Sequence, residues 1–265
     1  VRVVQSGEGA DELFAGYQTY GFHTNSKFIR VIAQGLKKLP KGTRYNLGRK
    51  IGKMKNFHGR IHLYESLAPA KEYFIGHARV FEEAEAADIL TDDFQQAPTV
   101  KDIMAAHYAN TDKIADEVNK MQYVDLHQWM PKDILLKADK LSMASSLEVR
   151  VPLLDIEVMK LAQQIPSKYL LNQNNTKDVF RQAANKHLPE EWSNRVKLGF
   201  PVPIKAWLKE DHGYRQVKEL FEADFAKEFF DQEKIMKLLN DHYEGRKEEQ
   251  RKIWTIFSFL TWYNV

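Results

Sequence analysis

The chain contains no cysteine, which excludes disulfide bonds, thiol nucleophiles and cysteine metal sites. It also lacks a long hydrophobic run, because its longest candidate, residues 253–263, is interrupted by hydroxyl side chains and is shorter than the roughly 20 residues that cross a bilayer. No charge of one sign dominates, since 39 Lys and Arg residues face 36 Asp and Glu residues, with a net charge of +3. This balance indicates neither a nucleic-acid partner nor a membrane partner. We therefore expect a globular, cytoplasmic protein.

Segments with β-sheet character are also scarce. Val1, Val3 and Val4 are β-branched and predict one strand at residues 1–5, and we expect this strand to be the only clear contribution of the chain to a sheet. A lone strand leaves its backbone donors and acceptors unpaired, so we expect its neighbours upstream of Val1 and the chain to be a fragment of a longer protein. The remaining residues predict mostly helices, the clearest of them at 64–81, 100–107, 114–130, 176–188 and 253–262.

A glycine-rich corner follows the predicted strand. Ser6, Gly7 and Gly9 allow a tight turn, and residues 11–17 then predict a helix with acidic residues in its first turn and apolar residues at helical spacing. A turn between a strand and a helix leaves amide N–H groups without intrahelical partners, and these groups can bind a phosphate.

Two carboxylates beside this corner complicate the prediction. Glu8 and Asp11 would repel a phosphate unless a divalent cation or a proton transfer takes part in the chemistry. The alternative is that Asp11 and Glu12 only complement the helix dipole while Glu8 is solvated. The local pattern leaves both interpretations open.

Three later features carry predictions of their own. Thr176 predicts the N-cap of a helix to residue 188, with Lys177 in its first turn, where a cation is mildly unfavourable unless it reaches an anion. Glu148 and Arg150 predict a structural ion pair before Pro152. The stretch 27–55, rich in Lys and Arg, predicts a solvated helical surface in preference to a phosphate or nucleic-acid patch.

The motifs of the chain resemble, in order, those of the synthetase domain of glutamine-hydrolysing asparagine synthetases. The corner reads SGEGADELFAGY at 6–17, and the resemblance continues with MPKDILLKADKLSMASSLEVRVPLLD at 130–155. It ends with TKDVFRQAANKHLP at 176–189 and RVKLGFPVPIKAWL at 195–208. The last block is open to two interpretations, a rigid, basic loop that closes over the cleft or a proline-stiffened connection; its residues are Arg195, Lys197, Gly199, Phe200, Pro201 and Pro203. Residues 24–119 carry little of the resemblance.

The resemblance implies a fold and a domain organisation. Residues 1–265 would be the C-terminal part of the synthetase domain, mostly helical in this fragment and part of an α/β adenine-nucleotide-binding fold of the PP-loop ATPase type. An N-terminal glutaminase domain and a pyrophosphate loop of the SGGxDS kind would lie upstream, because neither occurs in this sequence. On this expectation the isolated fragment lacks half of its nucleotide site and is inactive.

The implied reaction is ATP-dependent amide formation by a carbon–nitrogen ligase that uses Mg²⁺. Aspartate would be converted to asparagine through a β-aspartyl adenylate, with release of pyrophosphate and AMP, and ammonia would come from glutamine hydrolysed by the missing domain in cis. A homodimer is left open. The residues that the resemblance assigns are Glu8 and Lys177 for catalysis, Ser6, Gly7, Glu8, Gly9, Lys177 and Arg181 for ATP and pyrophosphate, Tyr17 and Lys137 on the substrate side, and Asp11 for the metal.

Two alternatives to this function are open. The β-lactam synthetases and other amide-forming relatives share these motifs and activate a different carboxylate. The fragment could also be a non-catalytic module that binds a nucleotide or a protein. Release of pyrophosphate with aspartate separates the first alternative, and ATP binding with and without Mg²⁺ separates the second.

Overall fold

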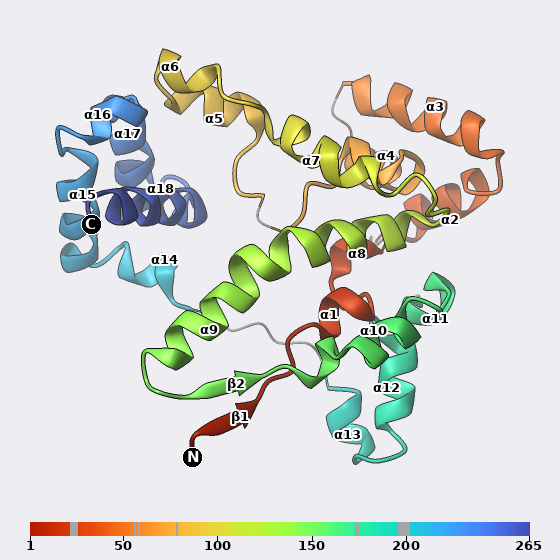
Figure 1. Ribbon diagram of the computed structural model, residues 1–265. Coiled ribbons are helices and arrows are strands. Elements are labelled where there is room, and N and C mark those ends of the chain that lie inside the picture. The colour runs from red at the N-terminus through yellow and green to blue at the C-terminus, as the bar shows by residue number, and fades with distance from the viewer. Residues whose placement is uncertain (22–25, 56, 58, 78, 173–174, 196–201) are drawn as a thin grey trace. The chain divides into compact units, whose positions relative to one another are not determined.

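Helices dominate the computed structural model of the chain (Figure 1). It describes residues 1–21, 26–55, 57, 59–77, 79–172, 175–195 and 202–265. The chain divides into two compact units, the first of Val1–His77 and Ile103–Arg195 and the second of Ala78–Asp102 and Val196–Val265. Hydrophobic clusters lie within each unit. None of the described helices is long and apolar enough to span a membrane.

The sheet of the first unit consists of two parallel strands. Strand β1, Val3–Gln5, confirms the strand predicted at the start of the chain, and it pairs with β2, Glu148–Arg150, in a register that places Val4 opposite Val149. The expectation that the chain supplies no second strand is therefore wrong. Strand β2 escaped prediction because its one apolar residue lies between two charged ones. Those two side chains form the predicted ion pair, with 2.8 Å between Arg150 Nε and Glu148 Oε1.

Helix α1, Ala10–Leu13, follows β1 and is only one turn long. The predicted continuation to Tyr17 is wrong because Ala15 has φ 54°, which lies in the left-handed region and stops a right-handed helix. Ala15 is fully buried. A 3₁₀ turn, η1, Gln18–Tyr20, comes next.

Helix α8, Glu117–His127, packs against α1 and confirms the centre of the helix predicted at 114–130. Its N-cap is Asp116, whose side chain accepts a hydrogen bond of 2.8 Å from the amide of Val118. The π-helical turn η3, Met130–Ile134, and helix α9, Leu135–Met143, then continue the same rod (Figure 1). Pro131 lies in the first turn of η3, where its missing N–H costs little.

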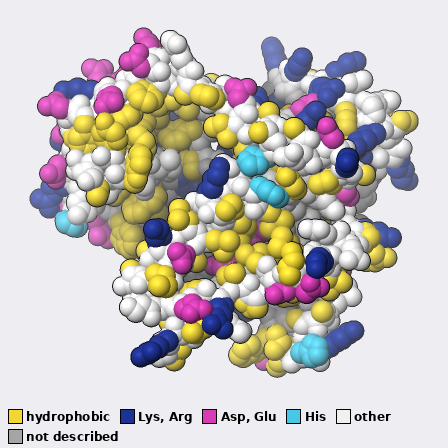
Figure 2. Space-filling view, in the orientation of Figure 1, with side chains coloured by type: hydrophobic (Ala, Val, Ile, Leu, Met, Phe, Trp, Pro, Cys, Tyr) yellow, Lys and Arg dark blue, Asp and Glu magenta, His cyan; other side chains and the backbone are white. Residues whose placement is uncertain are grey.

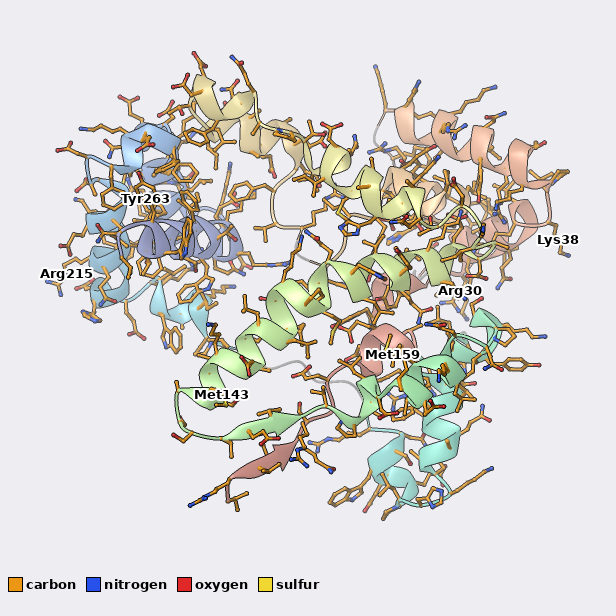
Figure 3. The ribbon with its side chains drawn as sticks, viewed as in Figure 1. Arg30, Lys38, Met143, Met159, Arg215 and Tyr263 are labelled. Carbon is orange, nitrogen blue, oxygen red and sulfur yellow. The ribbon has the colours of Figure 1, made fainter. Side chains whose placement is uncertain are left out.

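The remaining elements of the first unit surround this centre. They are α2 (Lys27–Leu36), α3 (Lys41–Lys53), α4 (Arg60–Leu67), η2 (Ala70–Glu72), the C-terminal part of α7 (Val100–Ala109), η4 (Pro152–Leu154), α10 (Ile156–Ala162), α11 (Ser167–Leu170), α12 (Asp178–Ala184) and α13 (Glu190–Ser193). The principal core contains Leu13, Phe14, Phe74, Met121, Val124 and Leu170. Met159 of α10 packs against it (Figure 3).

The basic stretch 27–55 forms α2 and α3, which pack on α4 through a small core of Ile29, Ala33, Ile51, Leu63 and Leu67. Lys and Arg side chains cover the outer side of α3 in Figure 2, and most of them are exposed. This arrangement agrees with the predicted solvated helical surface.

The second unit is formed by helices around a compact apolar centre. They are α5 (Glu83–Ile89), α6 (Asp92–Gln95), α14 (Ile204–Trp207), α15 (Asp211–Phe221), α16 (Ala226–Phe229), α17 (Gln232–Tyr243) and α18 (Gln250–Tyr263). The residues of that centre include Phe221, Ile235, Leu239, Ile253, Ile256 and Leu260, all at most 2% exposed. The last helix, α18, buries one face in this centre, whereas Trp262 on the other is 71% exposed.

Candidate functional site

The corner between β1 and α1 is fixed by one glycine. Gly9 precedes α1 with φ 89°, a backbone conformation that side-chain-bearing residues rarely adopt, and an added Cβ would overlap with the side chain of Leu154. The amide of Ser6 donates to the carbonyl of Arg150 at 2.9 Å and so extends the strand pairing. The amides of Gly7, Glu8 and Gly9 donate no hydrogen bond to any described residue.

An ion pair joins this corner to a distant part of the sequence. The Nζ atom of Lys177 lies 3.0 Å from Oδ1 of Asp11, and the two side chains are 17% and 25% exposed. The aromatic rings of Phe14 and Phe180 stack with their centroids 4.7 Å apart, which holds α12 against α1. The structure therefore brings together Asp11 and Lys177, two of the residues that the resemblance assigned to the phosphates and metal.

The backbone around Lys177 differs from the prediction. Lys177, not Thr176, is the N-cap of α12, and it has φ 56° and ψ 35°. The helix begins one residue later and ends at Ala184, four residues short of the predicted end. This left-handed residue is the one whose ammonium pairs with Asp11.

Glu8 and Gly16 lie on either side of Asp11 in the sequence. Glu8 is half-buried and forms no hydrogen bond or ion pair with a described residue. At Gly16 an added Cβ would overlap with Oδ1 of Asp11, and the Gly16 amide donates to the Asp11 carbonyl at 2.7 Å. Gly16 thus leaves the space that the Asp11 carboxylate occupies.

Arg181 does not direct its guanidinium at the Asp11–Lys177 pair. Its Nε donates to the carbonyl of Thr176 at 3.0 Å, and its Nη1 donates to the carbonyls of Ser193 at 2.8 Å and Arg195 at 3.1 Å. These contacts tie the start of α12 to the chain after α13. Of the predicted loop residues, Lys197, Gly199, Phe200 and Pro201 lie outside the described residues, whereas the Arg195 carbonyl accepts the bond from Arg181 and Pro203 is the N-cap of α14.

Lys137 also lies apart from the pair. It is on α9, and its Nζ is 3.8 Å from Oδ2 of Asp133, one turn earlier. Its side chain is 55% exposed, and no hydrogen bond or ion pair in the described part of the chain links it to Asp11 or Lys177.

Tyr17 belongs to a buried polar cluster that the sequence did not predict. Its hydroxyl donates to Oε1 of Glu12 at 2.7 Å and accepts a 3.3 Å hydrogen bond from Nε1 of Trp129. Glu12 is only 2% exposed, and burial raises the pKa of its carboxyl group. Burial and the neighbouring Glu12 also raise the pKa of the Tyr17 phenol far above its ordinary value. Tyr17 is therefore a neutral donor that holds Glu12.

A second buried carboxylate is linked to Tyr17 through His77. Asp125 of α8 is fully buried, and its Oδ2 accepts a 2.5 Å hydrogen bond from the hydroxyl of Tyr20. His77 Nε2 lies 3.1 Å from the same oxygen, and its ring lies 3.8 Å from that of Tyr17 between centroids. Asp125 follows Val124, which is fully buried as well. A charged residue on a buried helix face was the one available signal for this cluster.

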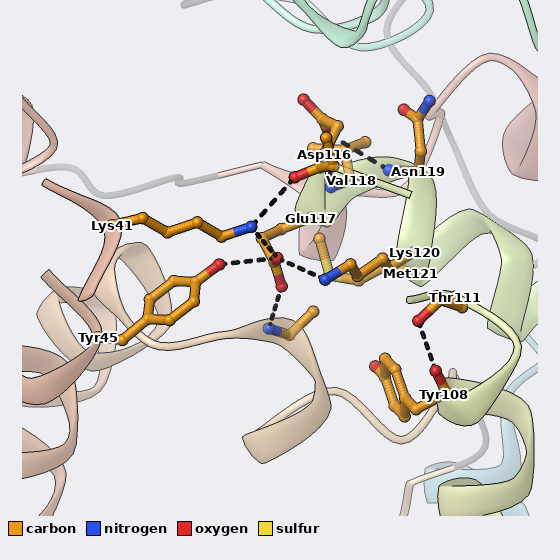
Figure 4. Close-up of polar contacts among 12 residues, drawn as sticks. Lys41, Tyr45, Tyr108, Thr111, Asp116, Glu117, Val118, Asn119, Lys120 and Met121 are labelled. Carbon is orange, nitrogen blue, oxygen red and sulfur yellow. Dashed lines mark hydrogen bonds and ion pairs between the residues drawn. The ribbon is translucent and has the colours of Figure 1, made fainter. Parts of the chain in front are cut away.

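A further polar cluster lies where α8 begins (Figure 4). Glu117 accepts hydrogen bonds from the hydroxyl of Tyr45 at 2.8 Å, from the amide of Ala70 at 2.7 Å and from Lys120 at 3.0 Å. These contacts join α3, η2 and α8, and they use both oxygens of the carboxylate. We assign this cluster a structural role.

The side chains of the corner are compatible with a metal ion that binds together with a nucleotide. Among the described residues, no three His, Asp or Glu side chains converge as metal ligands. Asp11 supplies one carboxylate, and Mg²⁺ is commonly held by one or two carboxylates together with substrate phosphates and water. The donor set is thus compatible with Mg²⁺ bound to a nucleotide.

Comparison with known proteins gives consistent matches over the whole chain. The asparagine synthase family matches residues 1–264. The chain is 36% identical over 273 residues to asparagine synthetase (glutamine-hydrolyzing) 1 of Bacillus subtilis strain 168, covering 100% of the chain and 40% of that protein. It is 34% identical over 267 residues to a putative asparagine synthetase (glutamine-hydrolyzing) of Mycobacterium bovis, covering 100% of the chain and 39% of that protein.

No solved structure gives a significant match. The chain spans about 40% of the length of these curated relatives. Because the family match covers nearly every residue, the chain belongs to the asparagine synthase family.

Proposed function

We propose that this chain forms part of the active site of an ATP-dependent ligase that converts aspartate to asparagine. The observation that carries the proposal is the 3.0 Å contact between Lys177 and Asp11 at a corner with free amide groups and Glu8. A cation, amide donors and carboxylates at one place are the groups that nucleotide chemistry requires. Family membership supports the ligase class.

The proposed reaction has two steps. The side-chain carboxylate of aspartate attacks the α-phosphate of ATP, and pyrophosphate leaves. Ammonia then attacks the activated carbonyl carbon, and AMP leaves with the former carboxylate oxygen. We propose that a glutaminase domain and a pyrophosphate loop in the longer protein supply the ammonia and the rest of the α/β ATPase-type nucleotide site.

The residues of the corner have distinct roles in this proposal. The Lys177 ammonium and the amides of Gly7, Glu8 and Gly9 offset the charge that develops on pyrophosphate. Asp11 would hold Mg²⁺, which when bound neutralises phosphate charge. Glu8 accepts a proton from the attacking ammonia, a role that requires a carboxylate within hydrogen-bond reach of the reacting nitrogen.

The other predicted residues have supporting roles. Arg181 holds the backbone at Ser193 and Arg195, so we propose that it orders the chain that follows α13. Tyr17 holds the side chain of Glu12, a residue of α1, by a hydrogen bond. Lys137, with its exposed amine, stays a prediction for the substrate side.

The test is an assay of the intact protein that contains this chain. With aspartate, ammonia, ATP and Mg²⁺, we expect asparagine and pyrophosphate in equal amounts. Lys177→Met removes the ammonium and should lower pyrophosphate release by about a hundredfold or more. Glu8→Ala should abolish asparagine formation while glutamine hydrolysis continues.

Glu157→Gln is the matched control, because Glu157 is exposed on α10 and, among the described residues, forms an ion pair only with Lys160. It should retain the wild-type rate. Unaltered turnover of the Lys177 or Glu8 variant would remove that residue from the mechanism. Pyrophosphate release with a different carboxylic acid, but none with aspartate, would identify a relative of the β-lactam synthetase type.

A further inference from the structure

We propose that Gln122 is a positioning residue for the Glu8–Asp11 corner. Its side-chain amide caps the C-terminal end of α1 and so fixes the direction in which the corner presents its carboxylates. This inference rests on the proposed function, and it concerns a residue that neither the motif nor the reaction assigns.

Helix α1 cannot hold its own position. It has four residues, whereas isolated helices shorter than about 12 to 15 residues are marginal in water. The left-handed conformation of Ala15 prevents the helix from growing. The carbonyls of Glu12 and Leu13 at its end accept no backbone hydrogen bond from the described residues, so another group must satisfy them once they are buried.

Gln122 satisfies both carbonyls. Its Nε2 donates to the carbonyl of Glu12 at 2.7 Å and to the carbonyl of Leu13 at 2.9 Å. These two bonds use both hydrogens of the amide nitrogen. The residue is only 7% exposed, so water does not readily replace the lost donor.

Helix α8, which carries Gln122, is held in place by its cap and by the principal core. Helix α8 is capped at its start by Asp116, and Met121 and Val124, on either side of Gln122, are at most 2% exposed in the principal core. The side chain of Gln122 therefore extends from a fixed helix to a short one. The short helix takes its position from the fixed one.

A shift of α1 would reach the chemistry directly. Asp11 is a residue of α1, and the turn that carries Glu8 enters the helix through Gly9. The Asp11 carboxylate lies between Gly16 and Lys177, so a displacement of α1 would move it out of its contact with Lys177. A misplacement of about 1 Å at a reacting group can cost about a hundredfold in rate.

Gln122→Met in the intact protein tests the proposal. Methionine keeps the length and packing of glutamine but donates no hydrogen bond. We expect the kcat of aspartate-dependent pyrophosphate release to fall about tenfold or more, with the KM for ATP changed less than threefold. We also expect amide hydrogen exchange at residues 9–14 to become at least tenfold faster, with a larger acceleration there than in α4, because two buried carbonyls lose their donor.

Gln128→Met is the matched control. It makes the same exchange at the C-terminal end of α8, where the side chain contacts His107 and Lys132 and not α1. This variant should keep the wild-type kcat and the wild-type exchange at residues 9–14. Gln122→Asn, whose amide is one methylene too short to reach both carbonyls, is the second variant if Gln122→Met does not fold, and the same losses are expected.

The two measurements separate the inference from the function on which it rests. Wild-type protein that releases no pyrophosphate with aspartate would overturn the proposed function, while faster exchange at residues 9–14 in the Gln122 variants would still support the positioning role. Wild-type exchange in those variants would overturn the positioning role, whatever the activity. A wild-type kcat in folded Gln122→Met protein would overturn it as well.

Discussion

The backbone conformation of Lys177 costs more free energy than its ion pair with Asp11 returns. Its φ of 56° lies in the left-handed region, which costs a residue other than glycine about 1 to 2 kcal/mol. The ion pair with Asp11 is partly exposed, and such pairs return about 0 to 1 kcal/mol. Stability alone does not explain a lysine here, whereas the anion that we propose at the corner would.

Lys177→Gly should therefore separate stability from activity. Glycine relieves the backbone but adds conformational freedom to the unfolded chain, at about 0.5 to 1 kcal/mol, and the ion pair is lost. We expect the free energy of unfolding, measured by urea denaturation, to change by no more than about 1 kcal/mol, while aspartate-dependent pyrophosphate release disappears.

Ser146→Gly is the control for the backbone effect, because Ser146 has φ 53° in an exposed turn after α9. It should keep both stability and activity. A loss of more than about 2 kcal/mol in Lys177→Gly would show instead that the lysine is mainly structural.

At the scale of elements, Glu117 joins α3, η2 and α8 and makes their packing sensitive to pH. Burial acts to raise the pKa of this carboxyl group, but the hydrogen bonds from the Ala70 amide, Lys120 and Tyr45 outweigh it and hold the pKa below its ordinary value of 4.5. Burial and the hydrogen bond to Glu117 raise the pKa of the Tyr45 phenol to about 12. Because the folded pKa of Glu117 is the lower one, the ionised group stabilises the fold above pH 4.5, and this contribution is lost as the pH falls through the folded pKa.

Glu117→Gln should show this dependence. At pH 7 we expect the free energy of unfolding to fall by about 1 to 3 kcal/mol, because a charge-assisted set of hydrogen bonds becomes a neutral one. The difference from wild type should shrink in urea titrations below pH 4.5. Glu157→Gln, on an exposed pair, should change stability by less than about 0.5 kcal/mol at either pH. A difference that does not vary with pH would contradict the assignment.

The elements also show what the sequence can predict and what it cannot. Periodicity located α7 and the centre of α8, and the valines located β1, because these signals lie in neighbouring residues. The sequence pattern did not reveal β2, which is a strand only because β1 pairs with it. The end of α1 and the start of α12 were missed because Ala15 and Lys177, which lie next to them, adopt a left-handed backbone that residues with side chains do not favour.

The candidate site divides in the same way. The motif resemblance singled out Asp11 and Lys177, and the structure places them in contact. The resemblance gave no indication of the contacts of Gln122 or of the hydrogen bond between Tyr20 and Asp125, since these contacts join residues more than 100 positions apart. Polar residues on a buried helix face carry a signal that a partner exists, but not which partner it is.

At the scale of the whole molecule, each unit has a hydrophobic core of its own, so unfolding is expected to occur in two cooperative steps. Phe221 is fully buried in the core of the second unit, and Leu67 is fully buried in the first. Phe221→Ala should lower the stability of the second unit by about 3 to 5 kcal/mol through the cavity it leaves. Amide hydrogen exchange should then accelerate in α15, α17 and α18, while α4 and α8 keep their protection.

Leu67→Ala is the reciprocal variant and should accelerate exchange in α2, α3, α4 and α8, while α15, α17 and α18 keep their protection, with a loss of about 2 to 5 kcal/mol. A calorimetric scan of either variant should show one of two transitions shifted. If both variants instead lowered protection to the same extent throughout the chain, the molecule would unfold as one cooperative unit. In that case the free energy measured for any residue of the corner, Lys177 included, would report on the second unit as well, and its effect on the site would have to be read from local exchange at residues 9–14.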